Sequence, residues 1–90
     1  MKFTVHKHPS YPGYVIENPR GDYMVRRLNL ANRVALFSNC EEAWIFPSKQ
    51  WAQIRAVDLN RYGAAGVYDA RKAPAEVRHR WNIHHTKGHP

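Results

Sequence analysis

The stretch YVIENPRGDYMVRRL, residues 14–28, decides the fold because it encodes two short strands joined by a tight turn. Its first strand alternates, with Tyr14 and Ile16 on one face, which is the period-two pattern of a half-buried strand. The NPRG tetrapeptide at 18–21 has turn chemistry, because proline presets φ at its second position and glycine accepts the exit conformation at its fourth. The sequence therefore predicts an antiparallel hairpin over 13–28, with Tyr14 and Tyr23 close across the strands.

Strand patterns also flank this hairpin on both sides. Residues 2–7 alternate, with Phe3 and Val5 on one face, and residues 34–37 form a fourth short apolar run. Turn residues separate the first run from the hairpin. We therefore expect a small antiparallel sheet of three to four strands from residues 2–37.

Two helices are predicted after the sheet. The SNCE tetrapeptide at 38–41 has the spacing of a capping box, in which Ser38 and Glu41 satisfy each other's backbone amides, so it predicts a helix that ends at Pro47. Ser48 is placed to cap a second helix, which Gly63 ends. A stripe at helical spacing indicates the buried face of this second helix: Trp51, Ile54, Arg55, Asp58, Leu59 and Tyr62. A strand over 51–57 is the alternative, because Trp51 and Arg55 also fit a period of two.

The expected fold class is therefore α+β, with the helical segment packed on one face of the sheet. Residues 1–62 are predicted to form the sheet-plus-helix core and residues 63–90 an appended basic arm of the same single domain. A short helix starting near Pro74 would place Val77 and Trp81 on one face. The predicted core comprises Phe3, Val5, Ile16, Val25, Leu36, Trp44, Ile54 and Leu59.

Length and composition exclude several classes of protein. Ninety residues suffice for one domain, and 43% hydrophobic with 23% charged residues is globular composition. No apolar run approaches the roughly 18 residues that a membrane span needs, and the N-terminus has no signal-peptide pattern. The single cysteine, Cys40, cannot form an internal disulfide. We expect a cytoplasmic protein with no membrane partner.

The charge is strongly basic and uneven. Lys and Arg total 14 against 7 Asp and Glu, which gives +7. Residues 61–90 hold six of the cations but only two of the acids, together with four of the six histidines. This asymmetry favours an anionic partner, and a merely solvated basic face is the alternative.

Enzyme and metal signatures are missing from the sequence. It contains no nucleophile elbow, glycine-rich phosphate loop or His-Glu-x-x-His motif. We therefore predict no catalytic residues, no metal ligands and no cofactor. One enzymatic alternative is a metal-independent ribonuclease, in which histidines act as base and arginines clamp phosphate. Its residues would be His79, His84, His85, Arg78 and Arg80.

Two binding functions fit the remaining features. The first is a protein–protein interface with an acidic host protein or nucleoprotein complex, because Trp, Tyr and Arg dominate interface energetics. Small bacteriophage inhibitors of host machines, including anti-defence inhibitors, have the same size and lack of enzyme motifs. The second is binding to DNA or RNA through phosphate contacts and aromatic stacking. Either function would use the same predicted residues: Arg20, Arg26, Arg27, Arg71, Lys72, Arg78, Arg80 and Trp81.

Overall fold

The computed structural model describes residues 2–29 and 34–86, and for residues 26–29, 34–36, 40 and 82–86 it describes the backbone alone. Four antiparallel strands form one sheet in the order β1-β2-β3-β4. Their bounds are Thr4–Lys7 for β1, Tyr14–Glu17 for β2, Tyr23–Asn29 for β3 and Val34–Ser38 for β4. With two helices added, this confirms the predicted α+β class.

The predicted hairpin is present, and its turn is held as its residue types suggest. The Asn18 side chain accepts hydrogen bonds from the backbone N–H groups of Arg20 and Asp22 at 3.0 and 2.9 Å. The Gly21 N–H donates to the Asn18 carbonyl in a positive-φ conformation that suits glycine. The predicted tyrosine pair is wrong, because Tyr23 lies opposite Glu17 while Tyr14 bridges to Phe46.

The segment after β4 differs from the helix predicted between Ser38 and Pro47. Only a short 3-10 helix, Cys40–Glu42, forms there. Its amides at Glu41 and Glu42 donate to the side chain of Asn39, which takes the capping role predicted for Ser38. The chain then extends, because Ala43 and Phe46 bridge to Val25 and Tyr14. Backbone pairing with the sheet therefore replaces the helix.

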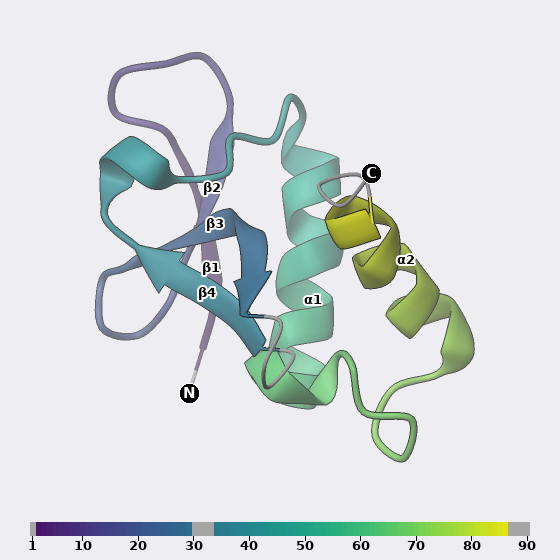
Figure 1. The fold of residues 1–90 in the computed structure, drawn as a ribbon. Helices are drawn as coiled ribbons and strands as arrows, with labels where there is room; N and C mark the ends of the chain where they lie inside the picture. The colour runs from purple at the N-terminus through teal and green to yellow at the C-terminus, as the bar shows by residue number, and fades with distance from the viewer. Residues whose placement is uncertain (1, 30–33, 87–90) are drawn as a thin grey trace.

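Two α-helices complete the fold (Figure 1). Helix α1 runs from Lys49 to Gly66, and the Ser48 hydroxyl accepts from the Trp51 N–H at 3.3 Å, as predicted. Its regular path is interrupted at Gly63 (φ 80°, ψ 165°), the residue predicted to stop it, and one further turn follows. Helix α2 runs from Ala75 to Thr86. In Figure 1, α1 lies across the sheet and α2 lies beside α1.

The core lies between the sheet and the two helices. Phe3, Ile16, Val25 and Leu59 are buried as predicted, whereas Trp44 and Val5 are half-buried against the core. Ile54 is exposed, so its predicted burial is wrong, and the Leu36 side chain lies outside the description. The same core cluster includes several residues of the predicted arm: Val67, Tyr68, Ala73, Val77 and Trp81. Residues 63–81 are thus packed into the domain.

No helix within residues 2–29 and 34–86 is long and apolar enough to cross a membrane.

Candidate binding surface

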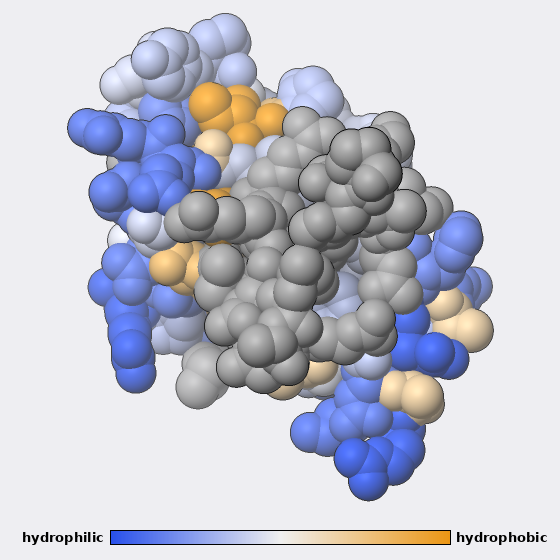
Figure 2. Space-filling model, in the orientation of Figure 1, coloured by the Kyte–Doolittle hydropathy of each residue, from blue (hydrophilic) through white to orange (hydrophobic). Residues whose placement is uncertain are grey.

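The basic residues that the sequence predicted to bind a partner lie in several different parts of the structure. Arg20 is exposed in the hairpin turn, and Arg71 and Lys72 are exposed in the connection between α1 and α2. Figure 2 shows hydrophilic side chains gathered over this connection and over the outer edge of the sheet. Arg26 and Arg27 lie on β3, and their side chains are outside the described residues. The nominated residues therefore do not form one described patch.

Three nominated residues on α2 serve the fold. Trp81 is 0% exposed and packs edge-on against Tyr68, with 6.1 Å between ring centroids, so its indole has no surface to offer a partner. Arg80 donates to the Asp58 carboxylate at 2.7 Å. The Nε of Arg78 donates to the Ala73 carbonyl at 3.2 Å. Trp81 is buried and the half-buried Arg78 and Arg80 bond other groups of the domain, which spacing along the sequence does not reveal.

Arg80→Ser is expected to reduce the free energy of unfolding by about 1.5–3 kcal/mol, because hydrogen bonds to a charged group contribute on that order. Arg71→Ser is the matched control, since the Arg71 side chain is 90% exposed and its ion pair with Asp69 lies at the surface. It is expected to change stability by less than about 0.5 kcal/mol. Urea unfolding followed by circular dichroism measures both changes. Equal destabilisation by the two variants would contradict this assignment.

Helix α1 buries a charged face. Arg55 and Asp58 are buried beside Ala52, Ala56 and Leu59, at helical spacing. The Arg55 guanidinium lies over two tryptophan rings, 5.8 Å from the Trp44 centroid and 5.2 Å from that of Trp81. Such cation–π contacts stabilise a desolvated cation.

Asp58 supplies the negative charge beside these cations, and its carboxylate accepts several hydrogen bonds. Its Oδ2 accepts from Arg80 Nη2 at 2.7 Å, from Arg80 Nε at 3.3 Å and from Trp81 Nε1 at 3.1 Å. Burial lowers the pKa of Arg55 to about 10, and the nearby Arg80 lowers it as well, whereas Asp58 raises it. Arg55 therefore stays cationic at neutral pH, and the Asp58 carboxylate offsets part of the cost of burying it.

The opposite face of α1 is exposed and carries large apolar side chains. Trp51, Ile54 and Val57 are 54%, 42% and 51% exposed. They are spaced three residues apart, so successive side chains are neighbours on the helix surface. We define the α1 outer face as these three residues with the exposed Gln50, Gln53 and Arg61. Apolar clusters exposed in this way are typical of interaction sites.

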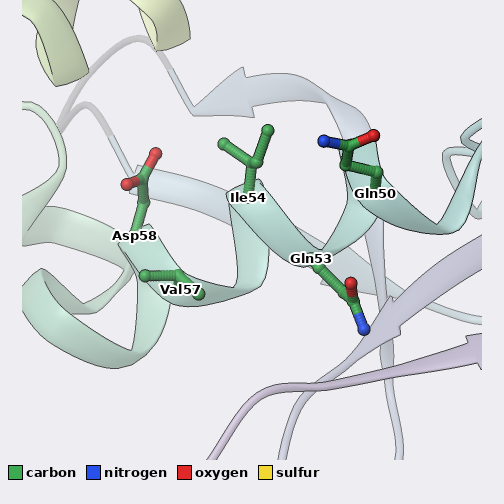
Figure 3. A pocket seen from close by; sticks show the side chains of 5 residues that line it. All are labelled: Gln50, Gln53, Ile54, Val57 and Asp58. Atoms are coloured by element: carbon green, nitrogen blue, oxygen red, sulfur yellow. The ribbon is translucent and has the colours of Figure 1, made fainter.

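A shallow groove of about 250 Å³ runs along the α1 outer face. Figure 3 shows how its lining divides: Gln50, Ile54 and Asp58 project along one row, and Gln53 and Val57 along the neighbouring row. Each row has the four-residue spacing of a helix surface ridge. The groove therefore has the shape into which a side chain of another helix packs.

The sequence stripe assigned Trp51 and Ile54 to the core and so missed the outer face. A signal for the alternative was present, because Ala52, Ala56 and Leu59 also recur at helical spacing. These small and aliphatic residues are the ones that the structure buries.

The residues considered for catalytic and metal chemistry are described only in part. No group of three or more His, Cys, Asp or Glu in that part of the chain is placed to hold a metal ion. For the ribonuclease alternative, His79 is exposed on α2, whereas the side chains of His84 and His85 lie outside the description. No protein-family model, curated protein or solved structure matches the chain.

Proposed function

We propose that this protein is a non-enzymatic binding protein that acts through a protein–protein interface on the α1 outer face. The exposure of Trp51, Ile54 and Val57 on a helix whose other side is packed carries the proposal. Tryptophan and aliphatic side chains that lose water at an interface are a usual source of binding energy. Phosphate groups gain nothing from Ile54 and Val57, so this surface favours a protein over a nucleic acid.

The charges around the outer face favour an acidic partner. Lys49 and Arg61 are exposed on α1, one near each end of the apolar residues. Asp58, the one acid of the helix, is buried against Arg80. A second copy of the chain would bring a further net charge of +7 to this surface, so self-association is disfavoured. Opposite charge on a different protein would instead steer and orient binding.

The partner segment that fits this surface best is an acidic amphipathic helix. Its apolar residues, spaced three or four apart, would enter the groove between the two rows of α1 side chains. Its acidic residues would then lie over Lys49 and Arg61. A partner that uses such an acidic surface to bind basic ligands would be blocked, so the proposed role is inhibition or modulation of a host macromolecular machine in the cytoplasm.

A synthetic helical peptide tests the proposal. It carries Leu at positions i, i+3, i+4 and i+7 and Glu at its solvent-facing positions. We expect titration with this peptide to shift the nuclear magnetic resonance signals of Gln50, Gln53, Ile54 and Val57. The double variant Ile54→Glu/Val57→Glu is expected to weaken binding at least tenfold while retaining its melting temperature, because both side chains are exposed.

Controls separate this function from its alternatives. The matched control variant is Lys2→Glu/Arg20→Glu, which changes two exposed residues that are not part of α1 and should lower affinity far less. A peptide of the same composition in scrambled order should bind weakly. Shifts confined to other surfaces, or equal binding by the Ile54/Val57 variant, would overturn the proposal. So would binding of duplex RNA or anionic vesicles that exceeds peptide binding and depends on the same two residues.

A further inference from the structure

The groove on the α1 outer face has the size of a site for one side chain. Its volume of about 250 Å³ is below the roughly 300–1,000 Å³ of small-molecule pockets. Ile54 and Val57 supply apolar walls, and Gln50 and Gln53 lie at its edge (Figure 3). Such a lining favours an apolar or aromatic group over a charged chain.

Asp58 places a carboxylate at this groove. Its side chain is 8% exposed, yet it lines the groove beside Ile54 and Val57. Every side-chain hydrogen bond seen for Asp58 within the described part of the chain ends on Oδ2, from Arg80 and Trp81. Oδ1 accepts none there, although a carboxylate oxygen accepts up to two. The Asp58 side chain is largely shielded from water, and an acceptor in such a site gains more from an added donor than a fully exposed acceptor does.

We infer that the groove binds a neutral aromatic N–H or O–H donor, a tryptophan or tyrosine side chain of the partner helix, which donates its hydrogen bond to Asp58 Oδ1. This inference rests on the proposed function and names the anchor residue of that interface. The same carboxylate already accepts the indole N–H of Trp81 at 3.1 Å, so its geometry suits such a donor.

The charges near Asp58 disfavour a cationic anchor. Arg80 forms an ion pair with Asp58, and Arg55 lies close enough to feel both charges. A lysine or arginine of the partner would therefore meet two cations beside one carboxylate. A neutral donor meets no such repulsion and still satisfies Oδ1.

Two small-molecule probes test the inference on the unmodified protein. Indole and 1-methylindole have nearly the same shape, but only indole donates an N–H. We expect indole to shift the methyl signals of Ile54 and Val57 saturably, with 1-methylindole binding at least tenfold more weakly. In a second pair, p-cresol should bind more tightly than 4-methylanisole. For each pair, the affinity of the donor is divided by that of its methylated analogue. A larger ratio for the indole pair identifies tryptophan as the anchor, and a larger ratio for the cresol pair identifies tyrosine.

Asp58→Asn provides the second measurement. It keeps the side-chain shape but removes the charge, so the preference for indole over 1-methylindole should fall at least threefold if the variant folds. Equal binding of each donor and its methylated analogue, or shifts away from the groove, would overturn the inference. Continued binding of the acidic peptide in that case leaves the proposed function intact. If the unmodified protein does not bind the acidic peptide but keeps the indole preference, the proposed function is overturned, and only the preference of the groove for an aromatic donor remains.

Discussion

Trp81→Ala is expected to reduce the free energy of unfolding by about 3–5 kcal/mol, the usual cost of truncating a fully buried large aromatic side chain. Trp81 is the largest of the fully buried side chains. Its ring packs against Tyr68 and the Arg55 guanidinium, and its N–H donates to Asp58. Small domains have total stabilities of about 5–15 kcal/mol, so the variant would be partly or wholly unfolded near 37 °C.

Trp51→Ala is the matched control for this prediction, because it removes the same side chain from an exposed position of α1. Its effect on stability should stay within about 0.5 kcal/mol. Trp81→Phe, which keeps a ring but loses the N–H donor, should lie between the two. Urea titration followed by circular dichroism orders the three variants. Similar midpoints for Trp81→Ala and Trp51→Ala would show that α2 does not contribute to the core.

Asp58→Ala is expected to cost about 3–5 kcal/mol, because it removes the anion that compensates the buried Arg55 and the paired Arg80. Asp69→Ala is the control: Asp69 pairs with the exposed Arg71, and such surface pairs contribute little to stability. The backbone N–H and guanidinium of Arg71 lower the pKa of Asp69, so its contribution is lost only as pH falls through that lowered pKa.

A second substitution identifies the source of the Asp58 effect. If the cost comes from an uncompensated buried cation, Arg55→Met in the Asp58→Ala background should restore part of the lost stability. No recovery would assign the cost to the lost hydrogen bonds from Arg80 and Trp81 instead. Thermal and urea unfolding of the two single variants and the double variant complete the cycle.

The sheet was predictable because its signals are local. The NPRG turn and the alternating runs on either side fix the pairing of neighbouring strands, and all four strands form within about two residues of their expected bounds. The helix expected after Ser38 does not form, and the reason lies in residues that are distant in the sequence. Its residues bridge to Tyr14 and Val25, which are 18 or more positions away in the sequence. Such tertiary pairing overrides a capping signal.

The orientation of α1 was not predictable from apolar periodicity alone. Trp51 and Ile54 are more hydrophobic than Ala52 and Ala56, so the usual pattern places them inside. The structure buries the alanines, whose small side chains suit close packing against the sheet, and buries Arg55 because two indoles and a carboxylate surround it. Those partners come from residues 44 and 81, and no local pattern links them to Arg55.

The separation of the two faces of α1 has an evolutionary consequence. Under the proposed function, substitutions at the exposed Ile54 or Val57 would alter recognition with little penalty to the fold, so this surface could diverge quickly as a partner changes. Asp58 is different, because its Oδ2 holds Arg80 and Trp81 while we assign its Oδ1 to the partner. A substitution at Asp58 would change both the specificity of the groove and the stability of the fold. We therefore expect substitutions of Asp58 to be rare in any lineage that keeps this architecture.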